Sequence, residues 1–408
     1  RDRSRASLES VAYGLASEGL TNVLALSGDY PKEGFGGRSR GVFDIDSVGL
    51  TTLLRQVFDK GPRFNIAVAI NPFKAIEADL VPQYLKLDMK ARAGADLAIT
   101  QVGYDPRSWS ELLAWNRAGP GMPLVAAVYV LTKGVARVFN TDVVPGIRLS
   151  DQLKAWVDQA AADDDKGRAR FLDLAAKQVA VARGMGFNGV YIAGQRDTVE
   201  IDKILDLAEG YQSDWRALLP DISYPESGAY RMFETGDLPQ LASDRRTRPT
   251  RSRRLPVMYR FNRLLHDRVF EPESKGFEVA RTFYRRLESA RLGRPAHVFE
   301  QAVKFTMFDC MDCGDCSLPD IAYQCPEGAC AKNQRNGPCG GTVNGECEVP
   351  GKPCVWTEAY ERLKPYGEAE DMLDREPVIQ DNILRGTSAW SNTFLGRDHY
   401  RHHRGEEP

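Results

Sequence analysis

The stretch that decides the fold runs from Asn65 to Gln101 and reads NIAVAINPFKAIEADLVPQYLKLDMKARAGADLAITQ. Residues 65–70 and 97–101 are short apolar runs that indicate strands. Residues 78–93 between them repeat apolar side chains at helical spacing, and Gly94 closes the helix. A strand, a helix and a second strand of these lengths are typical of a βα unit in a parallel sheet.

The same alternation extends in both directions from this unit. Its strands are short and apolar, as in a sheet buried on both faces. Five such units fit either an open doubly wound sheet or the last five-eighths of a (β/α)8 barrel. The sequence predicts further strands at 22–26, 124–131 and 189–193, helices at 4–19 (N-capped by Ser4), 44–60, 106–117, 166–184, 198–210 and 278–292, and a glycine-rich loop at 33–41.

Composition limits the class of protein. The 408 residues include 54 Lys+Arg and 56 Asp+Glu, a net charge of −2, which argues against a dedicated nucleic-acid binder. The longest apolar run, 124–131, is far shorter than the roughly 20 residues of a membrane span. The chain starts at Arg1 without a basic and apolar leader, so we expect a cytoplasmic protein. The arginines of 245–254 are interpreted as a solvated connection.

The eight cysteines are confined to the C-terminal third of the chain. Because disulfides belong mainly to small exported proteins, a metal or iron–sulfur module is the better interpretation. Three of them follow the Cys-x2-Cys-x2-Cys spacing that begins a bacterial ferredoxin motif. Eight thiolates suit two [4Fe-4S] clusters, two zinc sites or one of each. The candidate metal ligands are Cys310, Cys313, Cys316, Cys325, Cys330, Cys339, Cys347 and Cys354, and Gly337, Gly340 and Gly341 are expected to form a tight loop donating N–H groups to sulfur.

Polar residues follow three of the predicted strands. Ser27-Gly28-Asp29 follows the first, Asn71 the second, and Gln101 ends the third. In a barrel the carboxyl ends of the strands build the active site. Gly28 permits close approach of a flat ligand, a carboxylate at Asp29 can stabilise a developing cation, and the Gln101 amide suits the edge of a heterocycle.

Two segments resemble the methylenetetrahydrofolate reductase family. Residues 22–31, NVLALSGDYP, look like its flavin loop, and residues 93–101, AGADLAITQ, look like its next-but-one strand. The cysteine-rich stretch resembles the C-terminal domain often fused to these reductases, on the motifs CGDCSLP at 313–319, KNQRNGPCGG at 332–341, GECEV at 345–349 and CVW at 354–356.

The resemblance implies a (β/α)8 barrel with FAD or FMN at the strand ends, and hydride transfer from flavin N5 to methylenetetrahydrofolate. Asp29 would stabilise the iminium cation, and Gln101 would hold the pterin, with Phe139 covering it. The implied flavin contacts are Ser27, Gly28, Asp29, Ala69, Asn71 and Lys90.

The chain also departs from the family pattern. Asn71 stands where the family has a tyrosine, and Ala75 where it has a histidine. Asp2-Arg3 resembles the loop after the third family strand, so about three βα units and the glutamate that acts as general acid are expected upstream of Arg1. A half barrel alone would expose a sheet edge.

We therefore expect residues 1–211 to form the barrel part, 212–300 a connecting region, 301–366 a cysteine-rich domain and 367–408 a charged tail with exposed His399, His402 and His403. The principal hypothesis is a flavin-dependent reductase, an oligomer, whose clusters receive electrons from a ferredoxin-like protein. One alternative has structural zinc and NAD(P)H as donor. Another is an inactive electron-transfer or assembly subunit.

Overall fold

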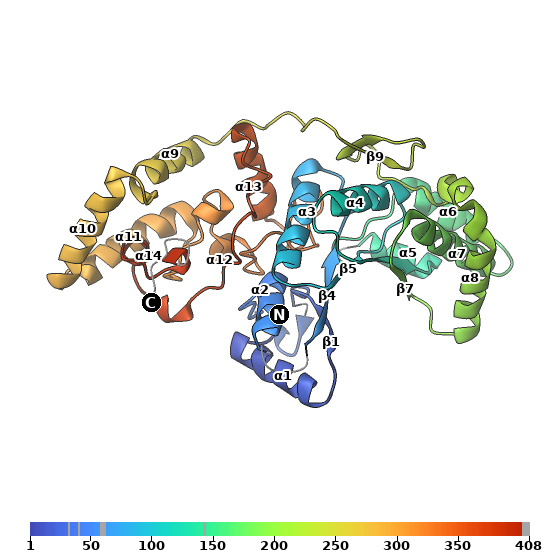
Figure 1. The fold of residues 1–408 in the computed structure, drawn as a ribbon, viewed down its shortest axis with the longest axis horizontal. Coiled ribbons are helices and arrows are strands. Elements are labelled where there is room, and N and C mark those ends of the chain that lie inside the picture. Colours follow the sequence, from blue (N-terminus) through green and yellow to red (C-terminus); the bar gives the residue numbers. More distant parts are fainter. Residues whose placement is uncertain (32, 40, 58–62, 142–143, 402–408) are drawn as a thin grey trace.

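The computed structural model describes residues 1–31, 33–39, 41–57, 63–141 and 144–401. Figure 1 shows two parts side by side, an α/β part and a C-terminal module, with an extended arm running from β9 to α9. The strands are β1 Asn22–Ala25, β2 Glu33–Gly34, β3 Gly37–Arg38, β4 Asn65–Ile70, β5 Leu97–Thr100, β6 Leu124–Tyr129, β7 Gly189–Ala193, β8 Phe233–Thr235 and β9 Ala242–Arg246.

Helices account for most of the remaining regular structure. Those of the α/β part are α1 Arg5–Ser17, α2 Ser47–Gln56, α3 Glu77–Arg92, α4 Pro106–Ala118, α5 Lys133–Phe139, α6 Asp151–Ala160, α7 Arg168–Met185, α8 Thr198–Tyr211 and η1 Gln212–Ile222. Those of the module are α9 Val257–Leu265, η2 His266–Phe270, α10 Lys275–Ser289, α11 Gly293–Phe308, η3 Pro319–Ile321, α12 Pro326–Ala329, α13 Val355–Leu363, η4 Lys364–Tyr366, η5 Asn382–Leu384, α14 Ala389–Phe394 and η6 His399–Arg401.

The main sheet is parallel and has the order β1-β4-β5-β6-β7. Each strand pairs with the next strand of the sheet, with Ala69 opposite Ile99 and Ile99 opposite Val125. A doubly wound sheet would reverse its order at a switch point. Because this order never reverses, the sheet curls in one direction as part of a barrel, and the chain has an α/β fold built on a half barrel.

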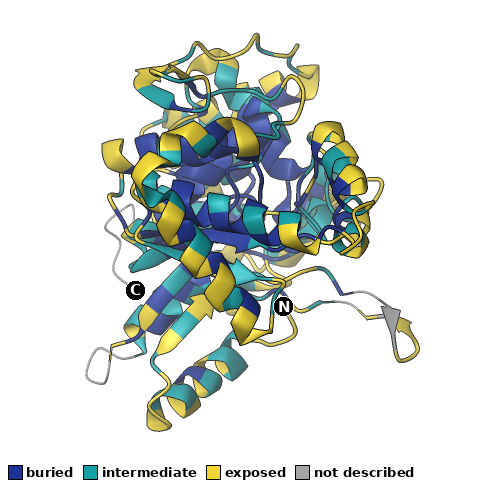
Figure 2. Cartoon of the chain, turned by 90° about the vertical axis from the view of Figure 1, so that its right-hand side faces the viewer, coloured by how far each residue is buried: buried dark blue, intermediate teal, exposed yellow. Residues whose placement is uncertain are grey.

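The two faces of the half barrel differ in burial. Ile66, Val68 and Ile70 of β4 are buried against the surrounding helices. On the inner face, Leu24 is 48% exposed and Tyr191 is 56% exposed. Figure 2 shows the same contrast, with a dark-blue core between sheet and helices. The inner face of the sheet is therefore open.

Helix α3 is buried on nearly all sides, which is unusual for a helix covering a barrel. It packs on β4 with one side and on α13 of the C-terminal module with another. Its first turn supplies two carboxylates to the module. Asp79 accepts bonds from Gly345 N (3.0 Å) and Thr357 Oγ1 (2.5 Å). Glu77 accepts from the Tyr360 hydroxyl and from Lys364 Nζ, both at 2.7 Å. Helix α3 thus joins the half barrel to the module.

Part of the expected connecting region packs on the half barrel. The Arg107 guanidinium of α4 donates to the carbonyl oxygens of Phe233 (2.7 Å) and Leu241. Its partner Glu111, also buried, accepts from Met232 N at 3.1 Å. These bonds attach the β8 and β9 region to helix α4.

The tail differs from its expectation, because the His399 side chain is only 8% exposed. Its Nδ1 lies 2.5 Å from Asp315 Oδ1 and its Nε2 lies 3.1 Å from Asp320 Oδ2. Burial lowers its pKa, but the two carboxylates outweigh this effect and raise the pKa of His399 to about 9. Because Asp315 stands between Cys313 and Cys316, the tail closes over the first cysteine loop. His402 and His403 lie outside the described residues.

The expected elements agree with the structure within a few residues where they are described. The first helix starts after Ser4, whose hydroxyl accepts from Ser7 N. The helix expected at 44–60 is α2, and residues 58–60 lie outside the described part of the chain, as does residue 40 of the expected loop. Among the described residues, no helix combines the length and apolar character that crossing a bilayer requires.

Candidate functional site

The polar residues singled out after the strands lie along one edge of the sheet. Ser27 follows β1, Asn71 follows β4, and Gln101 follows β5. The Gln101 N–H donates to the Ile70 carbonyl at 2.7 Å, which places Gln101 beside Asn71. Because parallel strands end at the same edge, the structure brings these side chains together.

The loop after β1 is held by hydrogen bonds. Ser27 Oγ accepts from Ser47 N at 3.1 Å and contacts Gln334 Oε1 of the module at 3.2 Å. Gly28 has a φ of +79°, in the left-handed region where a side chain is disfavoured. The Asp29 carboxylate is exposed beyond this turn.

The residues expected to contact flavin at the end of β4 form hydrogen bonds within the protein. The Lys90 ammonium on α3 is buried and donates to the Ala69 carbonyl at 2.6 Å. Burial, with a contribution from the nearby Lys86 charge, lowers the pKa of Lys90 to about 7. Asn71 Nδ2 donates to Gly146 O at 3.0 Å and to Gly340 O at 3.3 Å. The flavin-contacting roles of these residues stay predictions.

Gln101 and Phe139 are both fixed in place. Gln101 Oε1 accepts from Val102 N at 2.9 Å, which sets the plane of the amide. The Phe139 ring is buried edge-on to Tyr129, the last residue of β6, with centroids 5.0 Å apart. Gln101 follows β5 and Phe139 ends α5, the helix after β6, so both stand near the edge that carries Asn71.

A loop of the C-terminal module is seated on this edge. The buried Lys74 ammonium donates to the carbonyl oxygens of Gly340 (2.8 Å) and Thr342 (2.5 Å). Gln83 Nε2 donates to the Cys339 carbonyl at 2.8 Å. The backbone at Gly146 and the backbone at Gly340 lie so close together that a Cβ on Gly146 would be 2.1 Å from Gly340 O. The loop that carries Cys339 is therefore part of the strand-end site.

The described cysteines carry no disulfide and interact electrostatically as two groups. Burial raises the pKa of Cys316 to about 12, and Cys313 and Cys325 add to the shift. Cys325 is affected in the same way by Cys313 and Cys310. We define the first thiol set as Cys310, Cys313, Cys316 and Cys325.

The remaining four cysteines form the second thiol set, Cys330, Cys339, Cys347 and Cys354. Burial raises the pKa of Cys354 to about 12, with added effects of Cys339 and Cys330. Burial raises the pKa of Cys330 to about 11, with added effects of Cys339 and Cys347. The spacing in the sequence could not show which cysteines belong together. In the structure the first four cysteines of the chain form one set and the last four form the other.

Backbone N–H groups are directed at sulfur in both sets. Gly328 N lies 3.4 Å from Cys325 Sγ, and Val349 N lies 3.5 Å from Cys347 Sγ. The expected glycine loop is used differently, because the carbonyl oxygens of Gly337 and Gly340 accept from lysines of the half barrel. N–H groups placed in this way favour the thiolate form of a cysteine.

Two family models match separate parts of the chain. Residues 1–206 match the family described as "Methylenetetrahydrofolate reductase". Residues 290–382 match "Methylene-tetrahydrofolate reductase C terminal". The chain belongs to the methylenetetrahydrofolate reductase family.

One curated relative and one solved structure give the extent of the similarity. The 5,10-methylenetetrahydrofolate reductase of Pectobacterium carotovorum subsp. carotovorum is 35% identical over 113 residues, 26% of this chain and 33% of the relative. The matched part thus spans about a third of that reductase. A Clostridium thermocellum protein described as binding two copies of 5-methyl-5,6,7,8-tetrahydrofolic acid covers 52% of this chain and 91% of its own, with 11% identity and a TM-score of 0.33, too low to support an argument.

Buried cations surround the thiol sets of this family member. Lys304 Nζ lies 3.5 Å from Cys316 Sγ, and burial of Lys304 is outweighed by the nearby thiolates and Glu300, so its pKa is raised. Around the second set, the pKa of Lys332 is raised because Cys339, Glu348 and Asp29 outweigh its burial. Buried ammonium groups need compensating negative charge, and each of these also pairs with a carboxylate, Lys304 with Glu300 at 3.2 Å and Lys332 with Glu348 at 2.7 Å.

A metal site needs its ligands close together. Four thiolates bound to one zinc lie about 3.8 Å apart, given Zn–S bonds of about 2.3 Å. Within the described ranges, no three His, Cys, Asp or Glu side chains are gathered closely enough to hold a metal ion.

Sequence reasoning did not single out Lys74, Gln83 and Lys86, which join the half barrel to the module. Lys86 Nζ donates to Gly337 O (2.9 Å) and Gln334 Oε1 (3.1 Å). The available signal was in α3, where charged residues alternate with apolar ones around the whole helix. A helix without a solvent face must be covered on both sides.

Proposed function

We propose that the chain carries out flavin-dependent reduction of methylenetetrahydrofolate to methyltetrahydrofolate, with electrons relayed to the flavin by metal centres of the C-terminal module. The family membership supports the reaction. The relay is supported by the position of the second thiol set.

One observation supports the proposed electron transfer from the module to the flavin. The loop that bears Cys339 contacts the strand-end edge through Asn71, Lys74 and Gln83. The same edge carries the residues expected to hold flavin. A centre on the second thiol set would therefore lie directly beside the flavin, with no intervening domain.

The inner face of the half barrel fits a flat ring system. The residues facing inward near the edge include Ala67, Ala69 and Ala127, which share one face by their pairing with Leu24, Ile99 and Tyr191. Small side chains leave room, and the Gly28 turn lets the backbone approach the ring. A bound FAD or FMN would supply the hydride.

The chain's own side chains would bind and polarise the folate. The exposed Asp29 carboxylate would stabilise the positive charge that develops on the folate as its ring opens. Gln101, fixed through Oε1, would direct its Nε2 donor to the pterin edge. Phe139 would form an apolar wall for the pterin.

The thiol sets fit metal centres, because their thiols are buried or half-buried, backbone N–H groups are directed at sulfur in both sets, and the Lys304 ammonium lies 3.5 Å from Cys316 Sγ. In a [4Fe-4S] cluster each iron takes one thiolate, so the ligands stand farther apart than around one zinc. Eight thiolates suit either two clusters or two zinc ions, and the Cys-x2-Cys-x2-Cys spacing of the first set supports the clusters. Clusters would supply one-electron transfer from a ferredoxin-like donor.

Metal and flavin analysis of anaerobically purified protein tests this proposal. We expect about eight irons per chain, bound flavin, and formation of methyltetrahydrofolate with a reduced ferredoxin. About two zincs with NAD(P)H-dependent turnover would replace the relay by a structural module. Metal centres without flavin or turnover would favour an electron-transfer subunit.

A further inference from the structure

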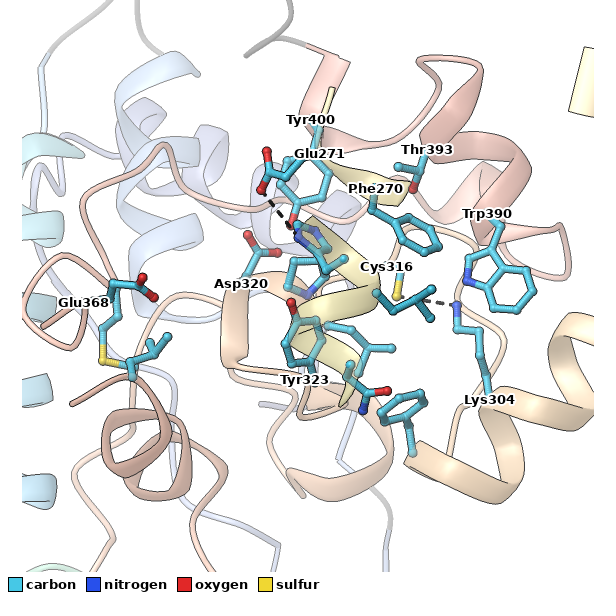
Figure 3. A pocket seen from close by; sticks show the side chains of 18 of the residues that line it. Phe270, Glu271, Lys304, Cys316, Asp320, Tyr323, Glu368, Trp390, Thr393 and Tyr400 are labelled. Atoms are coloured by element: carbon cyan, nitrogen blue, oxygen red, sulfur yellow. Dashed lines mark hydrogen bonds and ion pairs between the residues drawn. The ribbon is translucent and has the colours of Figure 1, made fainter. Parts of the chain in front are cut away.

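A large cavity lies in the C-terminal module, away from the strand-end site. Its volume is about 700 Å³, which is the size of a small-molecule pocket. It is bounded by α9 and η2 on one side and by α11, the η3 region and α14 on the others. Figure 3 shows the side chains converging on it from these elements.

The lining is mainly aromatic and aliphatic. Phe270 stacks on His266 with centroids 6.0 Å apart and planes within 9°, and it lies 6.3 Å from Trp390. His266 lies 5.9 Å from Tyr323. The aliphatic wall includes Leu265. Flat rings arranged around a cavity favour a flat aromatic ligand.

The cations that line the cavity are already paired. Lys304 Nζ binds Glu300 (3.2 Å) and Cys316 Sγ (3.5 Å). Arg375 is paired with Asp320 at 3.5 Å, and burial lowers the pKa of His266, so its imidazole is mainly uncharged at neutral pH. A phosphate or carboxylate on a ligand would have to displace one of these buried or half-buried pairs, at the cost of an unpaired charge. Lining carboxylates are paired as well, Asp320 with His399 at 3.1 Å and Glu368 with Arg263 at 2.5 Å, so the cavity suits an uncharged ligand.

One wall of the cavity belongs to the first thiol set. Cys316 lines it, and Figure 3 shows its sulfur facing the same space as Phe270 and Lys304. A ring bound in the cavity would therefore lie next to a cysteine of the first set. The second set lies at the other side of the module, against the half barrel.

We propose that this cavity binds an uncharged, planar aromatic ring of the flavin or quinone type. Its use as an entry point for electrons rests on the proposed function, because it requires a redox-active centre on the first thiol set. The binding itself does not require that centre.

Equilibrium dialysis tests the binding, using the full chain with its own flavin retained. The probes are lumiflavin and a fully methylated naphthoquinone, whose ring has no open position for thiol addition. Leu265→Trp would fill the cavity from α9, and Leu264→Trp is its matched control, because Leu264 is 53% exposed on the same helix and is not part of the lining. Met307→Trp fills the cavity from α11.

We expect at least one probe to bind, and the affinity to fall at least about tenfold in Leu265→Trp and Met307→Trp but less than about twofold in Leu264→Trp. The probe that binds more tightly identifies the ring type. FMN should bind more weakly than lumiflavin. If neither probe binds to iron-loaded protein, or if Leu265→Trp and Leu264→Trp behave alike, the cavity assignment is wrong. Probe binding to a protein without iron would retain the cavity and overturn only the relay.

Discussion

Asn71, the residue that follows β4, donates a hydrogen bond of 3.3 Å from its side-chain amide to the carbonyl oxygen of Gly340. The two residues are far apart in sequence, and Gly340 directly follows Cys339. This contact places a metal-binding candidate at the edge of the half barrel where folate and flavin are expected. The family resemblance had marked Asn71 as a departure, and in this fold the asparagine binds the module.

Lys74→Met should weaken the seating of the module. It leaves the carbonyl oxygens of Gly340 and Thr342 without their ammonium donor, and a buried acceptor without a partner costs about 1–3 kcal/mol. We expect unfolding at lower denaturant concentration and slower reduction of the flavin by the module, with metal content retained. Lys154→Met, on an exposed lysine of α6, is the control. Unchanged flavin reduction in Lys74→Met would show that electron transfer to the flavin does not depend on the contact between Lys74 and the module.

Lys90→Met should stabilise the protein most at low pH. Folding lowers the pKa of Lys90 from 10.5 to about 7. Between these values the unfolded chain binds a proton that the folded chain does not, so stability rises with pH, by at most about 1.4 kcal/mol per pH unit. The difference in unfolding free energy between Lys90→Met and the natural chain should be greatest below pH 7 and shrink toward pH 10. A constant difference across this range would contradict the buried, neutral Lys90.

Acid should release the module from α3. Burial alone would raise the pKa of Glu77, but hydrogen bonds from Lys364, Thr250 and Tyr360 outweigh it and lower the pKa below 4.5. The stabilisation from Glu77 is therefore complete above pH 4.5 and is lost as the pH falls through the folded pKa. Glu77→Gln should be less stable at neutral pH and show a weaker acid dependence in thermal melts. Parallel melting curves for both proteins from pH 3 to pH 7 would refute this role.

His399→Ala should loosen the first thiol set only. His399 holds Asp315, which lies between Cys313 and Cys316. With an iron chelator, we expect about half of the iron to be lost several-fold faster, while the half held by the second set is lost at its normal rate. His297→Ala is a useful comparison, since His297 binds Asp312 in the same region at the module surface. Uniform loss of all iron would mean that the tail stabilises the whole module.

Asp29→Asn should slow folate reduction much more than flavin reduction. The carboxylate is exposed at the strand ends and would act on the cationic folate intermediate. The Asn variant keeps the shape of the side chain and removes its charge. Rapid-mixing measurements of the two half-reactions separate the effects, and equal slowing of both would assign Asp29 to the flavin instead.

The strands could be predicted closely from the sequence, because each is a short apolar run bounded by polar or glycine residues. The run at 189–193 coincides with β7, and the run at 65–70 with β4. Helix α9 was not predicted, since prolines and arginines precede it, yet Pro256 serves as its N-cap residue, a position that needs no N–H donor.

The strand-end residues were found because parallel topology fixes where they meet. The long-range contacts were not, because Asn71 and Gly340 carry no local signal for their partner. The same reason explains His399, whose burial depends on two carboxylates some eighty positions earlier in the chain. Sequence patterns predicted which polar groups and cysteines are candidates for chemistry, whereas tertiary packing determined which of them lie together.

The most direct measurement follows the metal centres during a single turnover. Anaerobic protein is reduced chemically, freed of excess reductant and mixed rapidly with methylenetetrahydrofolate, and cluster and flavin signals are recorded by freeze-quench electron paramagnetic resonance and absorbance. The proposed relay predicts that the clusters are reoxidised as methyltetrahydrofolate forms, and that Lys74→Met slows this reoxidation. Product formation while the metal centres stay reduced, or in a protein that holds only zinc, would contradict it.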